Sequence, residues 1–126
     1  MPKLKVYLKP SCTTSRKVVT ILTQKGVEFE KVDYYKTPFT KTLLNDLLNK
    51  MNMKPSELLR KKEEAYKDLD LKNKTYTENQ LLNKMLKNPD LIERPIVAKG
   101  MKVMLARPAE SVKDIIWVYI GCEFFK

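Results

Sequence analysis

One cysteine near the start of the chain, Cys12, is the residue best suited to nucleophilic chemistry. It lies in the segment KPSCTTSR (residues 9–16), between a predicted strand and a predicted helix. A helix N-terminus carries partial positive charge, so the pKa of this thiol should fall from about 8.5 toward the range of about 3.5–7.5. Thr14 and Ser15 add hydroxyl donors and Arg16 adds a cation. We therefore expect a reactive thiolate rather than a buried structural cysteine.

The spacing of the cysteines and the lack of histidine exclude several chemistries. A dithiol oxidoreductase needs a second cysteine three residues after the first, and position 15 is Ser15, so Cys12 acts alone or with an outside thiol. Cys122 lies in the apolar stretch 117–125, where we expect it to pack. The chain has no histidine, which excludes Ser-His-Asp and Cys-His catalysis and His-based zinc sites; we expect no metal.

Arginine is rare in this chain, since only four of the 25 basic residues are arginines. Each one therefore indicates a position that needs a planar, bidentate donor. Arg94 precedes Pro95, a candidate cis-proline at the start of a predicted strand, and Arg107 ends the other strand of the same hairpin. Arg60 lies on a short predicted helix. Three guanidinium groups near one thiolate would bind a tetrahedral or planar oxyanion; a surface salt bridge is the alternative for each.

The composition describes one ordinary globular domain of 126 residues, with 43% hydrophobic residues and a formal net charge of +10. The lysines are scattered among acidic residues along predicted helices, which is typical of solvated helix faces, so we expect no nucleic-acid partner. The apolar runs are too short to span a membrane. Met1 is followed by lysines rather than by a signal segment, and we expect a reduced, cytoplasmic protein.

Hydrophobic periodicity predicts the order β-α-β, helices, β-β-α. The first 33 residues form a strand-helix-strand unit, which must be parallel with a right-handed crossover. This order is that of a thioredoxin-like α/β domain, a mixed sheet over residues 1–126 with a helical insertion over approximately 38–90. The predicted elements are strands at 3–8 and 27–32, a first helix that ends at Gly26, helices opened by Thr40, Pro55 and the capping box Thr77–Gln80, a hairpin over 91–106 turning at Lys99–Gly100, and a helix over 109–120.

Four segments of the chain can be read together: YLKPSCTTSR (7–16), LLRKKE (58–63) continuing to Tyr66–Lys67, LIERPIV (91–97) and RPAE (107–110). Together they resemble the ArsC family, the arsenate reductases of the glutaredoxin-dependent type. The resemblance covers roughly residues 4–116, in the family's order. Where family members often carry a histidine four residues before the cysteine, an asparagine before the proline and a glycine after the cysteine, this chain has Leu8, Lys9 and Thr13.

The resemblance implies a catalytic cycle in which one enzyme cysteine suffices. Cys12 would attack arsenate to form a cysteine–arsenic adduct, and Arg60, Arg94 and Arg107 would hold the oxyanion. Glutathione would then attack as co-substrate, and glutaredoxin would clear the mixed disulfide as arsenite leaves. No bound cofactor is implied. The residues that would support the thiolate are Thr14, Ser15 and Arg16.

Two other functions remain open on the sequence. One is a binding module similar to the Spx regulators, which share the fold and contact RNA polymerase. Those regulators typically have a two-cysteine switch in this loop, whereas this chain has Ser15 at the second position. The other is an ArsC-like protein that acts on a different oxyanion or thiol substrate.

Overall fold

The computed structural model describes residues 4–61, 66–67, 75–113 and 115. The chain forms two compact units. The sheet unit comprises Met1–Asp33 and Arg94–Lys126, and the helical unit comprises Tyr34–Glu93. Assignment of residues 1–126 to one domain with an inserted segment stays a prediction.

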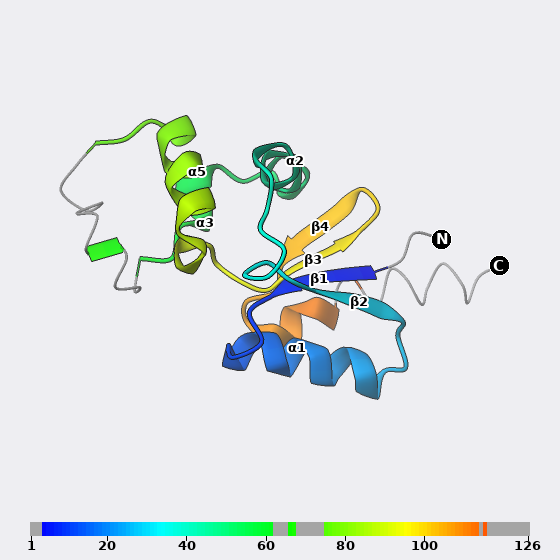
Figure 1. Cartoon of the computed structure of the whole chain (residues 1–126). Coiled ribbons are helices and arrows are strands. Elements are labelled where there is room, and N and C mark those ends of the chain that lie inside the picture. The colour runs from blue at the N-terminus through cyan, green and yellow to red at the C-terminus, as the bar shows by residue number, and fades with distance from the viewer. Residues whose placement is uncertain (1–3, 62–65, 68–74, 114, 116–126) are drawn as a thin grey trace. The chain divides into compact units, whose positions relative to one another are not determined.

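A four-stranded mixed sheet in the order β2-β1-β3-β4 forms the sheet unit (Figure 1). Val6 of β1 lies opposite Lys31 of β2 and Val97 of β3. β1 is parallel to β2 and antiparallel to β3, and β3 is antiparallel to β4. The predicted α/β mixed sheet is thus confirmed. The strands are β1 (Leu4–Leu8), β2 (Phe29–Asp33), β3 (Ile96–Lys99) and β4 (Lys102–Leu105).

Helix α1 (Thr13–Gln24) makes the crossover between the two parallel strands. Its buried residues Ser15, Val18 and Leu22 recur at helical spacing, so one face of the helix packs inward. The helix ends before Gly26, whose φ of 68° is a left-handed conformation that suits glycine.

The second strand begins two residues later than the sequence predicts. The N–H of Val27 donates to the carbonyl of Leu22 at 3.1 Å, so Val27 completes the end of α1 and the strand begins at Phe29. The backbone can pair with β1 only beyond these hydrogen bonds at the end of the helix.

One apolar core joins the sheet to α1 and to the 3₁₀ helix η2 (Ala109–Val112). Figure 1 shows α1 and η2 against the same face of the sheet. Burial of this core is the main driving force that holds the crossover helix and the hairpin together. Its buried members are Leu4, Val6, Leu8, Val18, Leu22, Val27, Val97, Ala106, Ala109, Val112 and Ile115.

The predicted hairpin is confirmed, because β3 and β4 pair with Lys99 opposite Lys102 and turn through Gly100. The predicted helix over 109–120 differs at its start. Its first turn is 3₁₀, since the N–H of Ser111 donates to the carbonyl of Pro108 at 3.0 Å, three residues back. Most of the remainder, and Cys122, lie outside the described residues.

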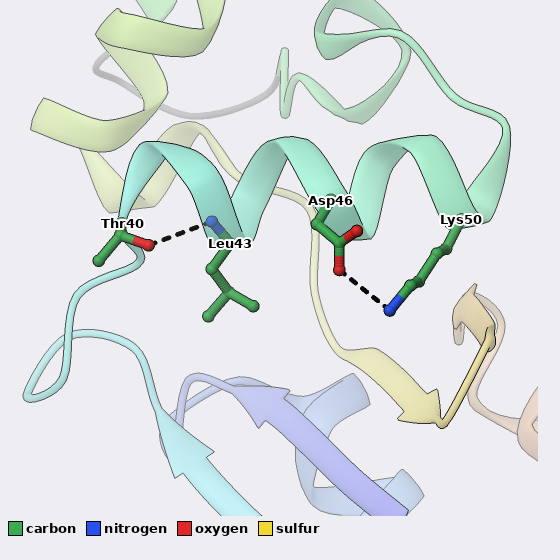
Figure 2. A network of polar contacts seen from close by, with 4 residues as sticks. All are labelled: Thr40, Leu43, Asp46 and Lys50. Atoms are coloured by element: carbon green, nitrogen blue, oxygen red, sulfur yellow. Dashed lines mark hydrogen bonds and ion pairs between the residues drawn. The ribbon is translucent and has the colours of Figure 1, made fainter.

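The helical unit contains α2 (Lys41–Met51), α3 (Pro55–Leu58), α5 (Glu78–Lys87) and the 3₁₀ helix η1 (Pro89–Leu91). Thr40 begins α2, as predicted, and its hydroxyl accepts from the N–H of Leu43 at 3.1 Å (Figure 2). Asp46 and Lys50 form an i,i+4 ion pair of 3.0 Å on the same helix. The predicted capping box Thr77–Gln80 begins α5. Local sequence signals therefore fix where both helices start.

An aromatic cluster lies at the beginning of the helical unit. The ring of Tyr34 stacks on Phe39 with centroids 5.1 Å apart, and its hydroxyl donates to the carbonyl of Ile92 at 3.4 Å. Ile92 in turn forms an antiparallel bridge with Leu59. These contacts tie the first and last residues of the unit to the segment that follows α3.

Candidate active site

Cys12 is the N-cap residue of α1, immediately before the first helical residue, Thr13. Its extended backbone (φ −78°, ψ 127°) precedes the first helical residue, and the thiol is free and half-buried. Two hydrogen bonds shape the loop before it: the N–H of Cys12 donates to the carbonyl of Lys9 at 2.9 Å, and Nε of Arg16 donates to the carbonyl of Pro10, also at 2.9 Å. The Arg16 side chain therefore holds the loop in place by donating to its backbone.

The environment of Cys12 lowers the pKa of its thiol to about 7. Burial by itself raises this pKa, but donors that favour the thiolate outweigh burial. They are the backbone N–H and hydroxyl of Ser15, the guanidinium of Arg94 and the backbone N–H of Thr14. About half of the protein therefore carries the thiolate near pH 7. This value lies within the range that the sequence analysis expects for a helix N-terminus.

Arg94 and Arg107 reach the site through the hairpin. The Arg94 side chain is buried and acts on the Cys12 sulfur. Nη1 of Arg107 donates to the main-chain carbonyl of Arg94 at 2.9 Å, and the rest of Arg107 is exposed. The Arg94–Pro95 peptide bond is cis, which the sequence alone did not establish, and so is Arg107–Pro108, which it did not anticipate. The structure thus places Arg94 beside Cys12 and joins Arg107 to Arg94, and these are two of the three predicted arginines.

Arg60 belongs to the helical unit, and its predicted position on a helix is wrong. Helix α3 ends at Leu58, and Leu59 is extended because it bridges Ile92. The N–H of Arg60 donates to the carbonyl of Leu91 at 2.7 Å instead of continuing the helix. The side chain is half-buried, with Nε and Nη1 away from solvent. Arg60 is therefore held in place by the pairing of two short extended segments, one around Leu59 and one around Ile92.

A pocket of about 300 Å³ lies beside the cysteine loop, where α1 meets the beginning of η2. Thr14, whose backbone N–H lowers the pKa of Cys12, also lines this pocket, so the pocket lies beside the first turn of α1. Two charged residues of this pocket, Lys17 and Glu110, were not predicted from the sequence. Lys17 could have been predicted, because it lies three residues after Thr14 and residues with this spacing are neighbours on the surface of a helix. The remaining lining residues are Arg107, Pro108 and Ala109.

None of the helices in the described ranges combines the length and the apolar character that a membrane-spanning helix needs. The same residues contain no cluster of three or more cysteine or carboxylate side chains suited to a metal ion.

Several known proteins are similar to this chain over nearly their whole length. The ArsC family model matches residues 7–115. The arsenate reductase of Neisseria meningitidis serogroup A is 32% identical over 117 residues, 92% of this chain and 100% of that protein. The "Uncharacterized protein YfgD" of Escherichia coli K12 is 40% identical over 115 residues, 90% of this chain and 97% of that protein. The solved arsenate reductase from Vibrio cholerae superposes with a TM-score of 0.84 at 30% identity, covering 90% of this chain and 98% of that chain.

The sheet, the crossover helix and the hairpin define a thioredoxin-like α/β protein, with a cysteine of lowered thiol pKa at the N-terminus of the first helix. The family match and the curated relatives place it more narrowly: the chain belongs to the ArsC family. The three departures from the family pattern have clear structural settings. Leu8 is part of the buried core, Lys9 offers its carbonyl to the N–H of Cys12, and Thr13 is the exposed first residue of α1.

Proposed function

We propose that this protein reduces arsenate to arsenite in the cytoplasm, with Cys12 as the nucleophile. The observation that carries the proposal is the pKa of about 7 at Cys12, produced at a helix N-terminus with the buried Arg94 beside it. A thiolate at neutral pH is the form that attacks an electrophilic oxyanion. The family relatives named arsenate reductase support the choice of arsenate.

Each site residue has a proposed role. Arg94 and Arg107 stabilise the negative charge of the oxyanion near the thiolate, and Arg60 supplies a third bidentate donor. The contact of Arg94 with Cys12 supports the first of these roles, and the resemblance to the family supports the role of Arg60. The residues that keep the thiolate ionised and its loop in place are Thr14, Ser15 and Arg16.

The reaction proceeds through one sulfur–arsenic bond. The Cys12 thiolate forms this bond as one arsenate oxygen leaves as water, and arsenic stays in the +5 state. Glutathione, as its thiolate, then attacks the Cys12 sulfur. A disulfide forms, the sulfur–arsenic bond breaks, and its electron pair remains on arsenic, which leaves as arsenite in the +3 state. A glutaredoxin thiolate finally takes the glutathione sulfur, and the Cys12 thiolate is regenerated.

An arsenate reduction assay tests the proposal directly. The purified protein with glutathione and glutaredoxin should produce arsenite, and omission of either reductant should stop turnover. Cys12→Ser should lower the rate to the enzyme-free background, because the serine hydroxyl is not ionised at neutral pH. Circular dichroism would establish that the variant is folded.

Two outcomes would contradict the proposal. Turnover by Cys12→Ser at the wild-type rate would exclude Cys12 as the nucleophile. Absence of arsenite from the folded wild-type protein with both reductants would exclude arsenate as the substrate, and would favour another oxyanion or an Spx-like binding function.

A further inference from the structure

The pocket beside the cysteine loop carries charges of both signs. Lys17 extends from α1, and Glu110 extends from the first turn of η2; both side chains are exposed. Among the described residues neither of them forms an ion pair with an opposite charge. Both charges are therefore available to a ligand.

The lining of this pocket combines two cations, Lys17 and Arg107, with the carboxylate of Glu110. The cations would attract a bare oxyanion such as arsenate, whereas Glu110 would repel it and carries a negative charge that such an ion cannot pair with. A ligand with carboxylates and an ammonium group satisfies both signs of charge at once. The volume of about 300 Å³ lies at the lower end of the range for small-molecule sites, about 300–1,000 Å³.

We infer that this pocket binds the zwitterionic part of a small peptide thiol, with Lys17 pairing with a carboxylate and Glu110 pairing with the ammonium group. The thiol of such a ligand must reach the Cys12 sulfur, and Thr14 links the pocket to that sulfur. The inference deepens the proposed function, on which it rests for the choice of glutathione as co-substrate. Lys17 and Glu110 are specificity residues and take no part in bond formation.

A reaction without arsenate tests the pocket separately from the proposed function. The Cys12 thiolate attacks one sulfur of oxidised glutathione, and a Cys12–glutathione disulfide forms as the sulfur–sulfur bond of oxidised glutathione breaks. The second glutathione leaves as a thiolate that keeps the electron pair of the broken bond. Peptide mass analysis would measure the rate of this disulfide at Cys12. Bis(2-hydroxyethyl) disulfide, which is uncharged, reports on the reactivity of the thiolate alone.

Lys17→Glu should slow the reaction with oxidised glutathione roughly tenfold, because a carboxylate then faces a carboxylate. The reaction with the uncharged disulfide should change by less than about twofold. Lys25→Glu, an equal change of charge at the other end of α1, is the matched control and should leave the reaction with oxidised glutathione within about twofold of wild type. Equal slowing by the two variants, equal slowing with the two disulfides, or no slowing would overturn the role of Lys17.

Glu110→Gln tests the inference with the opposite change of charge, because it removes a negative charge from the pocket. If only long-range attraction operates, removal of this negative charge speeds the reaction with oxidised glutathione, which is itself an anion. Pairing of Glu110 with the ammonium group predicts instead a rate lower by roughly threefold, with the uncharged disulfide unaffected. An unchanged or increased rate with oxidised glutathione would overturn the inference for Glu110.

Discussion

The helix N-termini of the sheet unit and of the helical unit are built differently. In the helical unit Thr40 and Thr77 accept hydrogen bonds from the first turns of α2 and α5. In the sheet unit α1 begins at Cys12, and within the described part of the chain no side-chain hydrogen bond caps this helix. The donors of its first turn act on the sulfur instead and lower the pKa of the thiol.

The residue at the helix N-terminus decides whether the first-turn donors stabilise the helix or keep a thiol ionised. A hydroxyl cap satisfies a backbone N–H and stabilises the helix, whereas a thiol at the same position uses the donor to stay ionised. The helical unit adds an exposed i,i+4 ion pair between Asp46 and Lys50, an ordinary feature of a solvated helix. The cysteine with the lowered thiol pKa thus belongs to the sheet unit, and the proposed role of Arg60 is what the helical unit would contribute to the reaction.

Arg60→Lys asks whether the helical unit contributes to the chemistry. The exchange preserves the charge but removes the planar pair of donors. We expect kcat/KM for arsenate to fall about tenfold to a hundredfold, with an unchanged thermal unfolding midpoint. Steady-state kinetics at fixed glutathione and glutaredoxin would measure the effect.

Lys61→Arg is the matched control, since it makes the reverse exchange at the exposed neighbouring residue. It should leave kcat/KM unchanged. Wild-type kinetics in Arg60→Lys would show that Arg60 is structural, and the helical unit would then have no part in the proposed reaction.

Thr40→Ala should affect stability and leave chemistry intact. Loss of the cap to the N–H of Leu43 should lower the free energy of unfolding by about 1 kcal/mol. Urea denaturation would measure this change, and the alkylation rate of Cys12 should stay at the wild-type value. Thr42→Ala, an exposed site in the first turn of the same helix, is the control and should change stability by less than about 0.5 kcal/mol. A slower alkylation of Cys12 in Thr40→Ala would show that the stability of the helical unit affects the reactivity of Cys12, contrary to the prediction.

Local signals in the sequence predicted much of the fold. The apolar spacing of α1, the threonine caps at Thr40 and Thr77, and the turn at Gly100 each depend on residues close together in the chain. The second strand was placed two residues early, because the end of α1 takes the N–H of Val27 before pairing can begin.

The site was less predictable, because its geometry depends on distant segments. The reactivity of Cys12 follows from its position at a helix start, but the contribution of the buried Arg94 required the hairpin to be placed beside the loop. The helix expected at Arg60 is replaced by hydrogen bonding of its N–H to Leu91, 31 positions away in the sequence. Pairing between distant residues of this kind overrides local helix propensity.

The rate of alkylation of Cys12 by iodoacetamide as a function of pH tests the central claim most directly. Only the thiolate reacts, so the rate should be high above pH 7 and fall as the pH decreases through the thiol pKa. With a pKa of about 7, the midpoint of the rate profile should lie near pH 7. A midpoint at about 8.5, the value of an ordinary thiol, would contradict the account.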